Sequence, residues 1–93
     1  MWRENLAWTI EFDAVALKQL QKLSQPTQLQ ILAYLKSLLK KSDNPQIFGK
    51  PLLNEKRGLW RYRVNKYRII CKIEKVKCLI IVVKIGKRDK VYE

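Results

Sequence analysis

The last third of this chain alternates apolar and polar side chains with a period of two, which is typical of β-strands. Trp60, Tyr62 and Val64 fall on one face of such a strand, whereas Arg61 and Arg63 fall on the other. A strand of this kind packs on one side only and presents arginines on its second side. We therefore expect the C-terminal part of the chain to form a sheet with one buried face.

The next strand strengthens this pattern. Asn65-Lys66 can form a two-residue hairpin turn, because asparagine tolerates positive φ. A return strand from Tyr67 then places Arg68 opposite Arg63, a register that a turn of another length would shift. Because like charges directly opposite each other destabilise a sheet, this arrangement indicates a bound anion, with RNA phosphate as the leading candidate. A solvated outer face is the alternative reading.

Apolar periodicity outlines the other elements. The first helix begins at Asp13 as N-cap and runs to about Leu23, with a buried stripe made of Ala14, Leu17, Leu20 and, at its end, Leu23. A second helix follows a break at residues 24–26, and its apolar positions from Leu29 onward predict deep burial. Strands are predicted at 6–12, 59–65, 67–74 and 78–85, with a loop over 45–58 and a tail that leaves the sheet at Gly86.

This order predicts an α+β fold of β-α-α-β-β-β type, with a helical hairpin packed on one face of a mostly antiparallel four-stranded sheet. The strand over 78–85 is apolar on both faces and should be central. The length of 93 residues indicates a single domain, 1–93.

Charge is distributed unevenly along the chain. The net charge is +12, with +2 in residues 1–49 and +10 in residues 50–93. Such a concentration indicates a polyanionic partner, with a soluble basic surface as the alternative. The chain has no apolar segment of transmembrane length and no signal-peptide core, so we expect a cytoplasmic protein without membrane contact.

Several chemistries find no support in the residues. Histidine is absent, acidic residues are scattered, and there is no glycine-rich phosphate loop. We expect Cys71 and Cys78 to serve as small apolar residues within strands. Their spacing does not match a zinc-binding motif. We therefore predict no cofactor and no metal.

Four segments carry a family resemblance. They are FGKPL (48–52), GLWRYRV (58–64), YRII (67–70), and IGKR followed by VY (85–88, 91–92). Together with the element order, they resemble the RelE branch of the RelE/ParE toxin superfamily over nearly the whole chain. The resemblance implies a type II toxin–antitoxin toxin that enters the ribosomal A site and cuts mRNA without a metal. Such an endoribonuclease leaves a 2′,3′-cyclic phosphate and a 5′-hydroxyl and inhibits translation.

The resemblance also implies roles for individual residues. Arg61 and Arg63 hold the region of the scissile phosphate, and Arg68 stabilises the charge that develops on the phosphorane. Arg88 protonates the leaving 5′-oxygen. Tyr92 stacks on the target nucleotide or orients it.

Further cations are expected to bind RNA. They are Lys50, Lys72, Lys87 and Lys90, although a solvated surface position is the alternative for Lys50 and Lys72. Some family members carry lysines in place of Arg61 and Arg63, or a histidine in place of Lys87. Arginine is a poor base, so proton transfer here falls to Lys87, Tyr92, water or the ribosome.

Partners and alternatives follow from the same resemblance. A toxin implies a cognate acidic antitoxin that wraps the chain and covers the basic face. The other partners are the ribosome and mRNA, and no direct DNA contact is predicted. The alternatives are a ParE-like toxin that inhibits DNA gyrase and a catalytically inactive homologue that binds only RNA or antitoxin.

Overall fold

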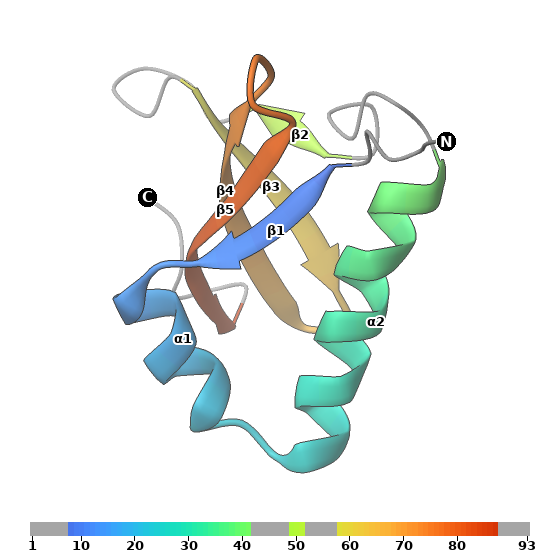
Figure 1. Cartoon of the computed structure of the whole chain (residues 1–93). Helices are drawn as coiled ribbons and strands as arrows, with labels where there is room; N and C mark the ends of the chain where they lie inside the picture. Colours follow the sequence, from blue (N-terminus) through green and yellow to red (C-terminus); the bar gives the residue numbers. More distant parts are fainter. Residues whose placement is uncertain (1–7, 42–48, 52–57, 88–93) are drawn as a thin grey trace.

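The computed structural model of the chain describes residues 8–41, 49–51 and 58–87. Its elements are β1 (Thr9–Phe12), α1 (Ala14–Gln21), α2 (Gln25–Lys41), β2 (Lys50–Pro51), β3 (Leu59–Val64), β4 (Tyr67–Glu74) and β5 (Leu79–Lys87). The strands form one sheet in the order β1-β5-β4-β3-β2, in which β1 runs parallel to β5 and the other neighbours are antiparallel. The two helices diverge like a V on one side of this sheet (Figure 1). The predicted α+β class is confirmed.

The sheet has one strand more than the prediction. Lys50 and Pro51 form the short edge strand β2, which pairs with Arg61 and Trp60 of β3. Only a loop was predicted here, because two residues are too few to show a period and a proline usually marks a turn. Proline is tolerated in an edge strand, where the missing N–H breaks no ladder.

The last strand is also longer than predicted. Gly86 pairs with Arg68 and Lys87 pairs with Tyr67, so the chain stays in the sheet at Gly86. The prediction that the tail leaves there was wrong, because pairing with the start of β4 outweighs the low strand propensity of glycine. Cys78 was also misplaced, since it lies in the turn before β5 with a φ of 51°.

The β3–β4 hairpin has the predicted register. Val64 pairs with Tyr67, and Arg63 pairs with Arg68. Asn65 adopts a positive φ of 54°, as a two-residue turn of this kind requires. The Asn65 side chain also donates a hydrogen bond of 2.7 Å to Gln30 of α2, which ties the turn to the helical layer.

Both helices begin where expected. The Asp13 carboxylate accepts a hydrogen bond of 2.9 Å from the amide of Ala16 and caps α1. However, α1 ends at Gln21, two residues before Leu23. The helix that follows begins at Gln25, at the predicted break.

The buried stripes of the helices differ from the prediction at their first positions. In α1 the buried residues are Ala16 and Leu20, whereas Ala14 is exposed and Leu17 is 42% exposed. In α2, Leu29 is 60% exposed. The observed stripe is Ala16 and Leu20 in α1, continued by Leu23 just after the helix, and it is Ile31, Leu35 and Leu38 in α2. Both follow i, i+4, i+7 spacing, so the α1 stripe is displaced from the predicted one and the α2 stripe begins two residues later.

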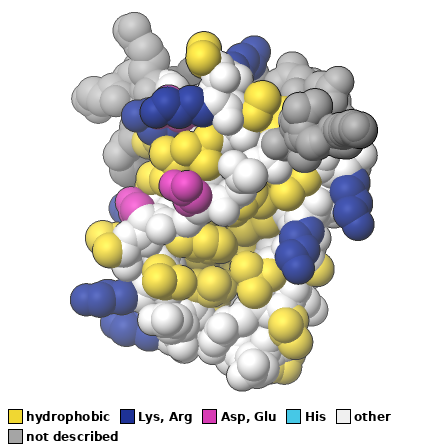
Figure 2. All heavy atoms as spheres, viewed as in Figure 1, with side chains coloured by type: hydrophobic (Ala, Val, Ile, Leu, Met, Phe, Trp, Pro, Cys, Tyr) yellow, Lys and Arg dark blue, Asp and Glu magenta, His cyan; other side chains and the backbone are white. Residues whose placement is uncertain are grey.

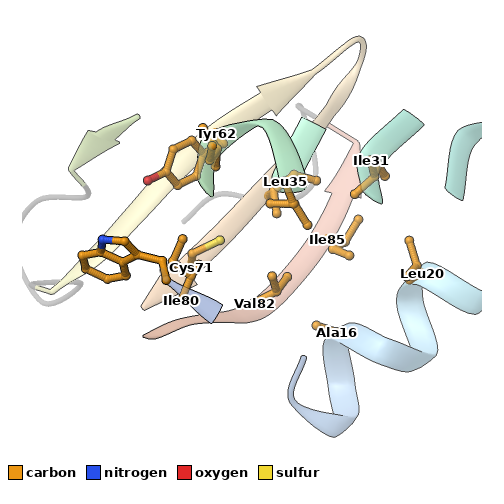
Figure 3. Close-up of a cluster of buried hydrophobic side chains, with 12 residues drawn as sticks. Ala16, Leu20, Ile31, Leu35, Tyr62, Cys71, Ile80, Val82 and Ile85 are labelled. Atoms are coloured by element: carbon orange, nitrogen blue, oxygen red, sulfur yellow. The ribbon is translucent and has the colours of Figure 1, made fainter. Parts of the chain in front are cut away.

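The core lies between the helices and one face of the sheet (Figure 3). Tyr62, Cys71 and Val82 are almost wholly buried there, and Tyr34 meets the Tyr62 ring edge-on with centroids 6.3 Å apart. Burial raises the pKa of the Cys71 thiol to about 12 and also raises the pKa of Tyr62. No charged or polar residue is buried in the described part of the chain. Strand alternation places the cations of β3 and β4 on the second face of the sheet.

Candidate functional site

Strand pairing gathers cations on the face of the sheet that points away from the helices. One row across the strands consists of Lys50 in β2, Arg61 in β3, Ile70 in β4 and Lys84 in β5. The adjacent row contains Arg63 and Arg68 directly opposite each other. Because neighbouring strands lie about 4.8 Å apart, these cations form a continuous positive surface. We call the surface made by Lys50, Arg61, Arg63, Arg68 and Lys84 the arginine face.

A hollow of about 280 Å³ opens on the arginine face. Its lining consists of Gly49, Lys50, Arg61, Tyr62, Arg63 and Arg68. Arg61 and Arg68 are half-buried, and the Nε and Nη1 atoms of Arg68 are shielded from solvent. Partial burial lowers the local dielectric, so these guanidinium groups attract an anion more strongly than exposed ones do. The hollow therefore suits a phosphate group.

Gly49 brings β2 close enough to complete the hollow. A Cβ atom at this position would lie 2.8 Å from Cε2 of Tyr62 and 3.0 Å from the carbonyl oxygen of Arg61. Only glycine permits this approach, which places Lys50 beside Arg61.

Two predicted RNA-binding lysines lie apart from the hollow. Lys72 is on the same face but forms an ion pair of 3.3 Å with Glu74, at the far end of β4. Lys87 pairs with Tyr67, and strand alternation puts it on the side of Ile85, towards the helices. Their roles in RNA binding remain predictions.

Three further predicted residues, Arg88, Lys90 and Tyr92, lie outside the described residues. In the parts that the structure does describe, no three histidine, cysteine or acidic side chains are grouped to hold a metal ion. The same ranges contain no helix that is long and apolar enough to cross a membrane.

Comparison with known proteins agrees with the fold. The profile of the family described as "ParE toxin of type II toxin-antitoxin system, parDE" matches residues 10–92. The chain belongs to the ParE toxin family. The predicted membership of the RelE/ParE superfamily is thereby confirmed. No curated protein matches the sequence.

Solved structures of RelE toxins share the fold. The toxin–antitoxin complex RelBE2 of Mycobacterium tuberculosis is similar with a TM-score of 0.78 and 23% identity, over 88% of this chain and 99% of that one. A mutant of Escherichia coli RelE in the free state gives a TM-score of 0.74 and 24% identity, over 91% and 87% of the two chains. The archaeal RelE–RelB complex of Pyrococcus horikoshii gives a TM-score of 0.68 and 18% identity, over 90% and 98%. This ParE-family chain therefore has a RelE-like fold.

The sequence predictions missed Lys84 of the arginine face and its neighbour Ile70. Ile70 is only 4% exposed although it points away from the helical core, and its register neighbours are Arg61 and Lys84. Nothing in the sequence marked Lys84, because residues 79–83 are all apolar, but in the structure the core residues Val82 and Ile85 are three positions apart in β5. A regular strand gives an even separation, so an odd one indicates a β-bulge.

The toxin has a second hollow with the opposite chemistry. It measures about 360 Å³ and lies between β1 and α2. Its lining consists of Trp8, Thr9, Ile10, Phe12, Leu32, Leu35, Lys36 and Leu39. Figure 2 shows hydrophobic side chains gathered in the middle of this helical side, with lysine and arginine around the border. An apolar lining with one lysine does not suit a phosphate, which leaves the arginine face as the candidate site for RNA.

Proposed function

We propose that this type II toxin is a ribosome-dependent mRNA endoribonuclease that acts in the cytoplasm. One observation carries the proposal: Lys50, Arg61, Arg63 and Arg68, from three strands, line a single hollow. Such a cluster of cations, two of them partly buried, fits a group whose negative charge increases during a reaction. A phosphodiester that passes through a phosphorane is such a group.

The proposed reaction uses the nucleophile that RNA itself contains. The 2′-oxygen attacks the adjacent phosphorus and loses its proton, and the bond from phosphorus to the 5′-oxygen breaks. The products are a 2′,3′-cyclic phosphate and a 5′-oxygen, which takes up a proton and becomes a 5′-hydroxyl. No serine or cysteine nucleophile is needed, so the chain has to position the RNA and stabilise charge.

The arginines divide this work in the proposal. Arg61 and Arg63 hold the phosphate region, and Arg68 stabilises the phosphorane, whose charge exceeds that of the substrate. Cations fixed in advance favour the transition state over the ground state. The planar guanidinium group suits phosphate oxygens and is already protonated before the reaction, so it does not act as the base.

Proton transfer is assigned to other groups. Arg88 donates to the 5′-oxygen, and Tyr92 orients the target nucleotide. Tyr92, water or the ribosome accepts the proton of the 2′-hydroxyl, because strand alternation puts Lys87 on the opposite side of the sheet.

The proposal includes a protein partner and the ribosome. Several structures of similar fold are complexes of RelE with the antitoxin RelB. With a net charge of +12, this toxin suits an acidic antitoxin that covers the arginine face. Addition of such an antitoxin should abolish cutting.

The test uses purified toxin and ribosomes programmed with a defined mRNA. We expect cuts in the A-site codon with 2′,3′-cyclic phosphate ends. A single 2′-deoxy nucleotide at the cut site should abolish cleavage there, because the nucleophile is missing. Intact mRNA in the presence of ribosomes, or cutting at the 2′-deoxy position, would overturn the proposal.

A second candidate function is inhibition of DNA gyrase, which the description of the matching family favours by naming ParE and parDE. The measurement that separates the two is a supercoiling assay with purified gyrase. Blocked supercoiling with gyrase-linked DNA breaks, and no cut mRNA, would establish the gyrase-directed toxin.

A further inference from the structure

We propose that Lys84 binds the phosphate next to the scissile one, so that the RNA strand crosses the sheet from the hollow towards β5. This inference rests on the proposed function and extends it to a residue that neither the family resemblance nor the hollow includes. Four observations on β4, β5 and α1 support it.

The first observation is a β-bulge that turns Lys84 onto the arginine face. Cys71 pairs with Val82, and its neighbour Ile70 pairs with Lys84, so Val83 is an additional residue in β5. Without the bulge, alternation from buried Val82 would direct Lys84 into the apolar core. With it, Lys84 is exposed and Ile85 returns to the core at 3% exposure. β-Bulges often redirect a side chain beside an active site.

The second observation is a hydrogen bond that holds the bulged segment. β1 pairs with β5 only as far as Phe12 and Val82, so among the described residues no strand pairs with this edge of β5 beyond that point. Here the amide of Ile85 donates a hydrogen bond of 2.7 Å to Oε1 of Gln19 in α1. The helix thus takes the place of a strand, and the backbone next to Lys84 is fixed.

The third observation is the position of Lys84 relative to the hollow. Lys84 is two strands away from Arg61, in the same row, but does not line the hollow. A ligand confined to the hollow therefore does not reach it. A polyanion with repeated phosphates does, if it continues across β4.

The fourth observation is the residue between the two cations. Ile70 is an apolar position, 4% exposed, in a row that is otherwise cationic. Ile70 carries no charge and exposes little surface, so a neutral position separates Arg61 from Lys84, and only a ligand with repeated charges can contact both. These features together specify a substrate with at least two phosphodiester linkages.

The test measures single-turnover cutting on programmed ribosomes by wild type, Lys84→Ala, Lys84→Arg and Lys18→Ala. Lys18 is an exposed lysine of α1 and controls for the loss of one charge. We expect Lys84→Ala to raise roughly five-fold the toxin concentration that gives half of the maximal rate, because one exposed ion pair is lost. The maximal rate itself should change little. Lys84→Arg and Lys18→Ala should resemble wild type, and thermal melting should show that every variant is folded.

A second arm locates the contact. One neutral methylphosphonate linkage is placed in turn at each of the two positions on either side of the cut. At one position, the neutral linkage should weaken substrate binding by the wild type roughly five-fold. The same linkage should cause no additional loss of binding for Lys84→Ala, because the contact is already absent. This coupling distinguishes a phosphate contact from a general effect of charge.

Each result has one reading. If wild type does not cut, the proposed function fails and the role of Lys84 fails with it. If wild type cuts and Lys84→Ala equals wild type, only the inference about Lys84 is overturned. The inference would also be overturned if Lys84→Ala and Lys18→Ala weakened cutting equally. It would be overturned as well if the effect of Lys84→Ala and the effect of every neutral linkage were additive.

Discussion

On the helical side of the sheet, Tyr62, Ile69 and Val82 are less than 2% exposed. On the other side, the same strands carry Arg61 and Arg68 half-buried and Arg63 exposed. Strand alternation produces both faces from one sequence, so neither face can be shifted without the other. The comparison teaches that the two faces differ in what they can do: the apolar face stabilises the fold, and the arginine face is available for a ligand.

The largest expected effect tests the apolar face. Leu35 is 1% exposed in the core, and Leu35→Ala should lower the free energy of unfolding by about 2–5 kcal/mol through lost burial and the cavity left behind. Leu29→Ala, in the same helix but 60% exposed, should stay within about 0.5 kcal/mol. Urea denaturation measures both. Equal losses for the two variants would contradict the assignment of the core.

The next effect concerns pH. Burial raises the pKa of the Cys71 thiol from 9.0 to about 12, so the unfolded chain loses this proton first. The resulting stability is fully present below pH 9 and falls as pH rises towards 12, with a slope approaching about 1.4 kcal/mol per pH unit. Denaturation curves measured at several pH values between about 9 and 10 give the free energy of unfolding as a function of pH. This free energy should fall less steeply with pH for Cys71→Ala than for wild type. Identical slopes would contradict a buried thiol at this site.

A smaller effect is expected at the start of α1. Asp13→Ala removes the carboxylate that accepts from the Ala16 amide and should cost about 1 kcal/mol of stability. Asp13→Asn keeps an acceptor and should retain most of the stability. Thermal denaturation compares the two, and an alanine variant as stable as the asparagine variant would contradict the cap.

The smallest effect sharpens the comparison of the faces. Arg63 and Arg68 are directly opposite each other, and like charges in such pairs repel. Arg63→Gln should therefore raise the stability of the free toxin by a few tenths of a kcal/mol at low salt while it weakens cutting. The gain should vanish at high salt, where exposed charges are screened. A loss of stability at low salt would mean that Arg63 supports the fold.

Much of this molecule is predictable from local patterns. Alternation in residues 59–64 and a turn residue at Asn65 suffice for the hairpin and the Arg63–Arg68 pair, because both depend on neighbours in sequence. The helix starts are equally local, since Asp13 caps its own first turn. Of the candidate site, the grouping of Arg61, Arg63 and Arg68 followed from the same alternation.

The remainder depends on contacts between distant segments. Strand β2 has two residues and exists because β3 is beside it, with Gly49 against Tyr62. The exposure of Leu17 and Leu29 reflects which side of each helix meets the sheet, which helical period alone leaves open. Lys84 reaches the arginine face only through a bulge that Gln19, 66 positions earlier than Ile85, helps to hold.

The most direct test of the arginine face as the active surface is a map of mRNA 5′ ends after brief induction of the toxin in cells. Wild type is compared with Arg61→Ala/Arg68→Ala and with Lys18→Ala/Lys22→Ala, which removes two exposed charges from the helical layer. We predict cuts within translated codons for wild type and the lysine variant, and a loss of about 100-fold or more for the arginine variant. Undiminished cutting by the arginine variant, or arrested growth with intact mRNA in wild type, would contradict the account.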